Sequence, residues 1–233
     1  MGYYTVKNAN SSENYKGFIR LSTPKGDLNY PFSAGYRVVP PSAAVSATQM
    51  SDFYIGVDNP VEINAAGVQA DQVSAGISNG SIVPRGNGKY VVRVRRAGTA
   101  RVSVSAKVNG ETMAMGSKEF RVKRIPDPVP GVSGKKSGGK STKGALRTGT
   151  YLYAKKADGF DFDANFNVLG FKVRIENRGK IETAKTSGNA ITGQQFGLIL
   201  KLRPGGTVVF EDIVAKGPDG ERRRLPPVVL IIQ

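Results

Sequence analysis

The sequence predicts a mostly β protein built of tandem immunoglobulin-like β-sandwich modules, the last of which carries one packed helix. The 233 residues include 29 Gly and 13 Pro but only 8% aromatic residues, which is typical of short strands joined by many turns. Along residues 100–108, Val102, Val104 and Val108 alternate with polar neighbours, as in a strand with one face in water. A recurring strand ending is the third observation.

This ending consists of a glycine beside an acid in a turn, then a strand, then prolines. It is clearest in Gly110–Pro130; an earlier version begins at Gly26, and a third runs from Asp219 to Ile232. A small β domain finishes in this way. We therefore expect three modules: the C-terminal hairpin of a truncated β domain in residues 1–43, an immunoglobulin-like β-sandwich in 44–124, and a C-terminal β-rich domain with a short helix in 125–233.

The first two modules differ in completeness. Residues 15–21 and 30–39 form a hairpin around the turn at 24–27. Two strands cannot sustain a core alone, so the start of this domain is expected to be missing. The second module has strand patterns at 44–47, 53–57, 61–63, 89–95 and 100–108, a loop at 67–73 and a tight turn at 76–80. About seven short strands in this length favour an immunoglobulin-like sandwich without the cystine.

The third module begins with a basic segment, residues 131–143, whose Gly, Ser and Lys content predicts a flexible loop. Strands are expected at 160–166, 169–175, 207–214 and 224–232, with a short helical turn near 144–147. Thr192 and Gln195 have the spacing of a helix capping box, and Pro204 stops the helix that follows.

Composition excludes several classes of function. The chain has no Cys and no His, which removes most transition-metal sites and most nucleophile-base pairs. No catalytic constellation is found, so an enzyme, a cofactor and a small-molecule substrate are not expected. The net charge is +16, and it rises along the three modules from +3 through +5 to +8. Such a charge favours an anionic partner.

Two motifs were weighed and rejected. Gly134–Ser141 matches the phosphate-binding pattern G-x-x-x-x-G-K-[ST], but prolines precede it, and neither a buried strand before it nor a helix after it is predicted. Asp161, Asp163 and Asn165 begin like a calcium loop. That loop needs Gly at its sixth position and Glu at its twelfth, where this chain has Phe166 and Lys172.

Six basic residues are the candidate partner-binding groups, although most charge runs are merely solvated. They are Lys135, Lys136, Lys140, Arg222, Arg223 and Arg224. Nucleic acid is not the expected partner, because basic residues are not interleaved with stacking aromatics and no recognition helix is apparent.

Three ordered blocks carry a family resemblance: residues 53–60, 120–130 and 210–227, which include Asp58-Asn59-Pro60 and Leu225-Pro226-Pro227. With them the whole chain resembles the C-terminal periplasmic part of the GldM/PorM family, the shaft subunit of the type IX secretion and gliding-motility machine.

The resemblance implies a non-enzymatic role. It implies a homodimeric rod in the periplasm, anchored in the inner membrane by a segment absent from this chain. The rod would transmit force or torque from a proton-driven inner-membrane motor subunit, bound through the N-terminal part, to an outer-membrane ring lipoprotein complex, bound through the C-terminal domain. The alternative from the residues alone is a β-sandwich adhesin or carbohydrate-binding module array, although Trp is absent.

Overall fold

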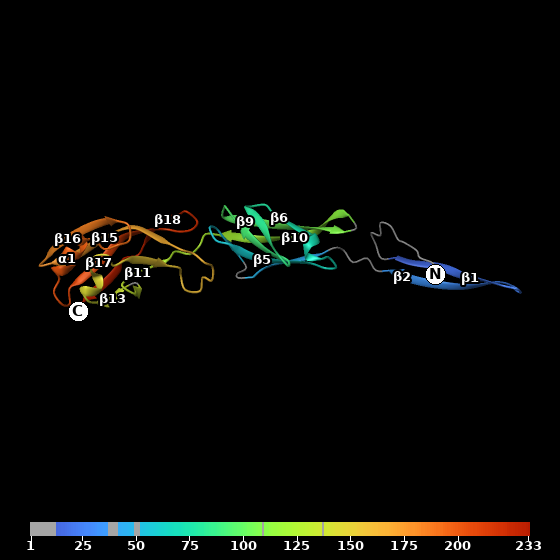
Figure 1. Cartoon of the computed structure of the whole chain (residues 1–233), viewed down its shortest axis with the longest axis horizontal. Helices are drawn as coiled ribbons and strands as arrows, with labels where there is room; N and C mark the ends of the chain where they lie inside the picture. The colour runs from blue at the N-terminus through green and yellow to red at the C-terminus, as the bar shows by residue number, and fades with distance from the viewer. Residues whose placement is uncertain (1–12, 37–41, 49–51, 109, 137) are drawn as a thin grey trace. The chain divides into compact units, whose positions relative to one another are not determined.

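The computed structural model describes residues 13–36, 42–48, 52–108, 110–136 and 138–233. The chain divides into two compact units, Met1–Ser42 and Ala43–Gln233, and each is described by itself (Figure 1). The predicted mostly β fold is confirmed: strands dominate the described residues, and α1 (Gly193–Leu200) is their single α-helix. No helix among them is long and apolar enough to span a bilayer.

The first unit is an antiparallel hairpin of β1 (Glu13–Thr23) and β2 (Gly26–Tyr36). Its turn is fixed by the Thr23 hydroxyl, which donates a hydrogen bond of 2.7 Å to the Gly26 carbonyl. Phe18, Ile19 and Tyr30 are each more than half exposed. The hairpin agrees with the sequence, while the expected strand residues 37–39 lie outside the described residues.

Within the second unit, residues 43–123 form two packed four-stranded sheets. One has the order β3-β5-β8-β7 and the other β4-β10-β9-β6. Their bounds are β3 (Ala43–Ala47), β4 (Phe53–Tyr54), β5 (Asn59–Ala65), β6 (Val73–Ile77), β7 (Ser81–Gly86), β8 (Lys89–Arg93), β9 (Gly98–Val108) and β10 (Glu111–Lys123), with the 3-10 turn η1 (Ala70–Gln72) between β5 and β6. All pairs are antiparallel except β4 with β10.

Buried and exposed side chains alternate along the strands of this sandwich, and the buried ones form its core. Val102 and Val104 of β9 are buried, as predicted, and Phe53 stacks on Phe120 with ring centroids 4.3 Å apart. Asn59 is fully buried and pairs its amide with the backbone of Tyr54, Val57 and Val92. Because buried polar groups are costly unless paired, this one side chain fixes the turn between β4 and β5.

Residues 126–233 form a second β module around its own core. A six-stranded sheet has the order β13-β19-β17-β15-β16, with β18 also pairing with β17, and a three-stranded sheet has the order β12-β11-β14. The bounds are β11 (Val129–Val132), β12 (Lys135–Lys136), β13 (Gly138–Ser141), β14 (Leu152–Lys155), β15 (Asn167–Asn177), β16 (Lys180–Ser187), β17 (Thr207–Lys216), β18 (Arg222–Leu225) and β19 (Val228–Ile232), with the 3-10 turn η2 (Gly144–Leu146).

Helix α1 packs against one face of the six-stranded sheet. The capping box predicted at its start is present: Thr192 accepts a hydrogen bond from the Gln195 backbone, and the Gln195 side chain accepts one from the Thr192 backbone. Gln195 is fully buried and also donates to the Ala184 carbonyl of β16. The polar cap is therefore also the contact that seats the helix on the sheet.

Two expectations for this module were wrong. Residues 131–143 are not a flexible loop, because they contribute to β11, β12 and β13, and β13 runs parallel to β19. Residues 160–166 are not a strand, although the alternation is real: Phe160 and Phe162 are buried and Asp161 and Asp163 are exposed. An irregular segment can bury every second residue when a neighbouring module covers it.

The last predicted strand is interrupted. β18 and β19 both pair with β17 in one register, since Leu225 faces Ile213 and Val228 faces Phe210. Pro226 and Pro227 fall between them and cannot donate backbone hydrogen bonds. Opposite them Asp212 takes a φ of 51°, so the irregularity involves both strands.

Candidate functional site

The feature that most clearly invites a functional interpretation is the contact between the two β modules of the second unit. An apolar cluster forms its centre. Tyr54 from β4 meets Phe160 edge-on at 5.0 Å and Phe162 at 5.2 Å, measured between ring centroids. Ile125, from the link between the modules, is buried in the same cluster. Aromatic pairs of this geometry add about 0.5–1.5 kcal/mol each beyond area burial.

Backbone meets backbone beside this cluster. Gly56 follows β4 with a φ of +84°, and a Cβ placed on it would lie 2.4 Å from the Asp219 nitrogen and 2.5 Å from the Asp219 Cα. Only glycine fits such a close approach and such a backbone conformation. The turn after β4 is therefore in direct contact with the turn between β17 and β18.

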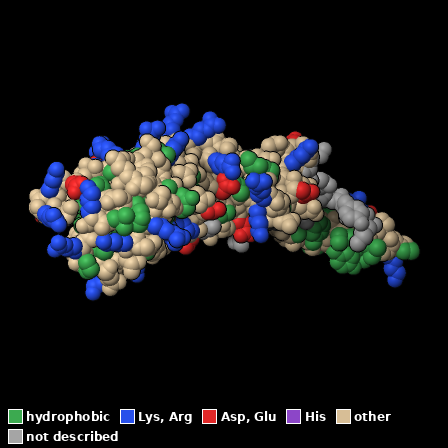
Figure 2. Space-filling model, turned by 60° about the vertical axis from the view of Figure 1, so that its left-hand side comes forward, with side chains coloured by type: hydrophobic (Ala, Val, Ile, Leu, Met, Phe, Trp, Pro, Cys, Tyr) green, Lys and Arg blue, Asp and Glu red, His purple; other side chains and the backbone are tan. Residues whose placement is uncertain are grey.

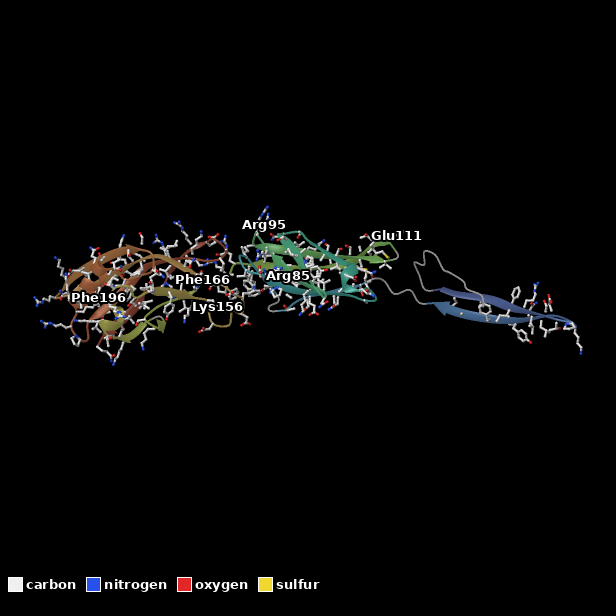
Figure 3. All side chains as sticks on the ribbon, in the orientation of Figure 1. Arg85, Arg95, Glu111, Lys156, Phe166 and Phe196 are labelled. Carbon is white, nitrogen blue, oxygen red and sulfur yellow. The ribbon has the colours of Figure 1, made fainter. Side chains whose placement is uncertain are left out.

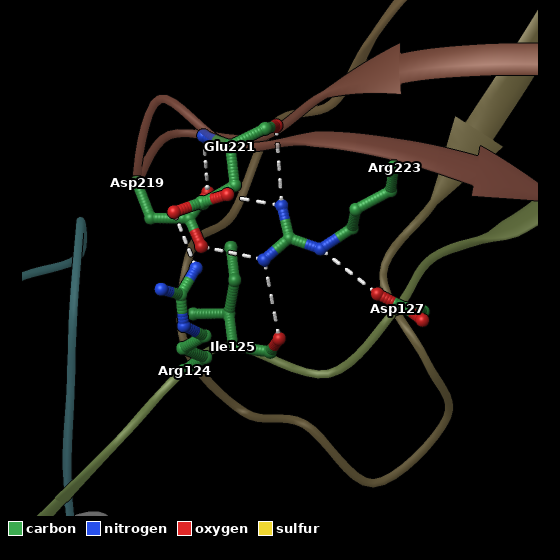
Figure 4. Close-up of polar contacts among 6 residues, drawn as sticks. All are labelled: Arg124, Ile125, Asp127, Asp219, Glu221 and Arg223. Carbon is green, nitrogen blue, oxygen red and sulfur yellow. Dashed lines mark hydrogen bonds and ion pairs between the residues drawn. The ribbon is translucent and has the colours of Figure 1, made fainter. Parts of the chain in front are cut away.

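Arg223 organises the polar side of the contact (Figure 4). From β18 its Nη1 donates to Asp219 Oδ1 at 3.0 Å, its Nε lies 2.8 Å from Asp127 Oδ1, and its Nη2 donates to the Ile125 carbonyl at 3.4 Å. The side chains of Arg223 and Asp219 are 9% and 1% exposed. One guanidinium thus joins the β17–β18 turn to both ends of the inter-module link.

Further contacts surround this arrangement. Arg124, the first residue of the link, forms an ion pair with Glu221 in the β17–β18 turn. Phe166 and Lys156 lie at this end of the C-terminal module, where Figure 3 labels them. The Arg223 guanidinium lies 5.7 Å from the centre of the Phe166 ring, and Lys156 donates to the Phe162 carbonyl. The segment that carries the two buried phenylalanines is held from both sides.

The electrostatics of the contact follow from burial and pairing. Burial opposes ionisation of Asp219, but the hydrogen bonds and the charge of Arg223 outweigh it, so the pKa of Asp219 lies below the ordinary value of an aspartate. The hydrogen bond to Asp219 likewise raises the pKa of Arg223. Both groups are charged at neutral pH, and this is the state in which their fork-like pairing is strongest.

These residues can hold two modules together, but they offer little for catalysis. No group of three or more acids that could hold a metal ion occurs in the described part of the chain. Asp161 and Asp163 of the rejected calcium pattern are exposed on either side of Phe162. The Gly134–Ser141 pattern contains strands β12 and β13 instead of a phosphate-binding loop before a helix.

The six basic residues singled out in the sequence fall in different places. Arg223 points into the inter-module contact, whereas Arg222 and Arg224, its neighbours on β18, are exposed. Lys135 and Lys140 are exposed on β12 and β13, and the backbone of Lys136 pairs with Gly131. Whether any of them contacts a partner stays a prediction, but Arg223 has an internal partner set already.

Sequence reasoning missed the glycine and the acid on which the contact depends. Gly56 reads as an ordinary turn residue, and Asp219 as the acid of an Asp-Gly turn, because nothing in either local pattern announces a partner about 160 residues away. The only related signal in the sequence is the alternation of Phe160 and Phe162 with acids, which shows that these rings are buried but not by what.

Two family models match the chain, and together they span nearly all of the second unit. Residues 42–123 match the GldM third domain, and residues 126–233 match the GldM C-terminal domain. No curated protein sequence matches significantly.

Solved structures resemble the chain only in general architecture. A protocadherin gammaB7 EC3-6 structure is 11% identical with a TM-score of 0.27, and the match covers 95% of this chain and 58% of that one. Three N-terminal domains of the bacteriophage RB49 capsid protein Hoc are 11% identical with a TM-score of 0.36, covering 98% and 82%. The Escherichia coli adhesin FdeC is 14% identical with a TM-score of 0.27, covering 99% and 87%.

Replacing Gly56 by alanine should open the inter-module contact. The new Cβ would collide with the Asp219 backbone, so we expect faster amide hydrogen exchange in residues 216–225, measured by mass spectrometry. Gly67→Ala is the matched control, since Gly67 has a similar φ of +75° but open space around it. If residues 216–225 exchanged equally fast in Gly56→Ala and in Gly67→Ala, the faster exchange would come from backbone strain and not from a collision with Asp219.

Asp219→Asn should make the free energy of unfolding depend less strongly on pH at acid pH. Because the pKa of Asp219 is lowered in the folded protein, its charge stabilises the fold above the unfolded pKa of about 3.9. That contribution is lost as the pH falls through the folded pKa. The gap in unfolding free energy between wild type and variant, from urea titrations, should therefore be largest near pH 7 and narrow below about pH 4. A difference in unfolding free energy that stays constant with pH would contradict the pairing of Asp219 with Arg223. The control is Asp161→Asn, which changes an exposed aspartate.

Proposed function

Because the chain belongs to the GldM family, we propose that it forms part of a non-enzymatic shaft in the periplasm. The shaft is a dimeric rod that carries force or torque from an inner-membrane, proton-driven motor to an outer-membrane-associated ring. The family is one of gliding-motility and type IX secretion components, and it has a structural role in that machinery. The observation that carries the proposal is the match of two consecutive family domains across residues 42–233.

The inter-module contact supports a mechanical role. A component that transmits force needs joints that resist bending, and two domains joined only by a flexible linker would absorb the load. Here the link of residues 124–128 is fixed by Ile125 in the apolar cluster and by Asp127 on Arg223. Bending between the modules would separate Tyr54 from Phe160 and Phe162 and would open the close approach of Gly56 to Asp219, so this packed contact resists it.

The charge distribution supports assigning the ring-binding end to the C-terminal module. The excess of basic residues is greatest in this module. Complementary charge orients docking and speeds association more than it raises affinity. A basic tip is therefore suited to finding and orienting on an acidic ring surface.

Weakening the inter-module contact in the full-length protein should stop force from reaching the ring. The double variant Phe160→Ser, Phe162→Ser removes the aromatic cluster, and we expect type IX secretion and gliding to fall sharply while binding of the C-terminal module to the ring persists. The control is Asp161→Ser, Asp163→Ser, which changes the exposed residues of the same segment.

Replacing a buried phenylalanine by a small residue lowers protein stability by about 3–5 kcal/mol. Circular dichroism must therefore show that the double variant remains folded. Gly56→Ala is a milder second variant that perturbs the same contact. Normal gliding and secretion in both folded joint variants would contradict the proposed shaft role.

A further inference from the structure

The six-stranded sheet of the C-terminal module has two faces with different surroundings. Its inner face packs against α1 and the three-stranded sheet, and Val173, Ile175 and Ala184 point into that core. The opposite face, defined here as the outer face, is made by the residues that alternate with them. No element of the described part of the second unit covers it.

An aliphatic strip lies on one side of the outer face, on β17 and β19. Val209 of β17 faces Val229 of β19 across the strand pair, and Ile231 lies two residues further along β19. Val229 and Ile231 are 41% and 42% exposed. Apolar side chains arranged side by side on an open sheet form a patch that water wets poorly, which is a common property of binding surfaces.

Cations are spread over the rest of the outer face, and one of them lies next to the strip. Arg222 and Arg224 alternate with the inward Arg223 on β18, Lys185 extends from β16, and Lys140 lies beside Ile231 on β13. These four have no ion-pair partner within the described residues. In Figure 2 the visible face of the C-terminal module likewise shows Lys and Arg side chains with few acids.

Of the acids on the outer face, Glu211 and Asp212 are neutralised already, whereas Glu176 is exposed near the end of β15. Lys172 lies 2.9 Å from both Glu211 and Asp212, and Arg174 pairs with Glu211 at 3.1 Å. The pKa of Asp212 is lowered, first by the hydrogen bond from Lys172 and further by the charges of Lys185 and Arg224. A hollow of about 340 Å³ lies between Gly170, Lys185, Asp212 and Arg222. The positive charge of this surface therefore remains available to a partner.

We propose that the outer face is the surface through which this module binds an acidic protein. Under the proposed function, on which this inference rests, that protein belongs to the outer-membrane ring. Apolar side chains next to charged ones are common in protein interfaces, and the outer face offers both. Five strands abreast at about 4.8 Å, each with about eight residues at about 3.4 Å, give a face of roughly 650 Å², close to the ~800 Å² per partner of a standard interface.

The side chains favour protein over other anionic partners. Nucleic-acid binding on an open sheet relies on aromatic side chains that stack with bases. On the described strands of this sheet, Phe171 and Phe210 both point into the core, and the outer face presents aliphatic residues. Insertion into a lipid surface relies on an amphipathic helix or on exposed aromatic side chains. The described residues of the outer face include neither.

Charge reversal with a matched control tests the proposal. Arg222→Glu, Arg224→Glu in the full chain changes two exposed outer-face residues, and Arg147→Glu, Arg203→Glu changes two exposed cations that lie outside its strands. Binding to the purified ring complex, followed by biolayer interferometry, should weaken about tenfold or more for the first pair, with a smaller effect at high salt, and only slightly for the second. Val229→Ser, Ile231→Ser should also weaken binding, mainly through faster dissociation.

The outcomes separate the two claims. If wild type fails to bind the ring, the proposed function falls and this inference falls with it. If wild type binds and the outer-face variants bind equally well, or if both charge pairs lose affinity alike, the inference is overturned while the proposed function stands. Loss of binding to duplex DNA or phosphatidylglycerol vesicles by the Arg222, Arg224 variant, with ring binding intact, would also overturn it.

Discussion

The link between the two modules of the second unit is held by one buried guanidinium. Arg223 reaches from β18 to Asp219, to Asp127 and to the Ile125 carbonyl, so a single side chain connects a turn to the link between modules. A charge this well covered is stable only while its partners stay in place. The apolar cluster around Tyr54 and the close approach at Gly56 keep them there. Separating the modules would therefore expose the apolar surface of this cluster and break the ion pair of Arg124 with Glu221.

The alternation of β18 divides its arginines between two tasks. Arg223 points inward and holds the link between the modules, while Arg222 and Arg224 are exposed on the outer face. A module that carries force needs a contact with the preceding module that resists bending, and it also needs a surface that binds the next component. The same short strand supplies residues to each. The strand of the proposed ring contact is therefore also the strand that holds the link between the modules.

The fold was largely predictable because its signals are local. Alternating valines in β9, the Thr192 capping box and the turn glycines each act within a few residues. The joint was not predictable, because it pairs Gly56 with Asp219 and Arg124 with Glu221, and no local pattern reports such distant contacts. The error at 160–166 has the same cause: the two phenylalanines alternate to meet the other module and not to form a strand. Residues 131–143 were misread because a Gly and Lys composition suggested mobility, whereas parallel pairing of β13 with β19 holds part of the segment in a sheet.

The central claim is that the two modules of residues 43–233 move as one body, and a pair of spin labels tests it most directly. The chain has no cysteine, so Ser103→Cys and Thr183→Cys, both exposed, place one label on each module. With doubly labelled protein diluted into an excess of unlabelled protein, so that only distances within one chain are measured, double electron-electron resonance should give a single narrow distance distribution, and a broad one when Gly56→Ala is added. A distribution already broad without that change would mean that the joint bends freely, and the shaft account would then be wrong for this part of the chain.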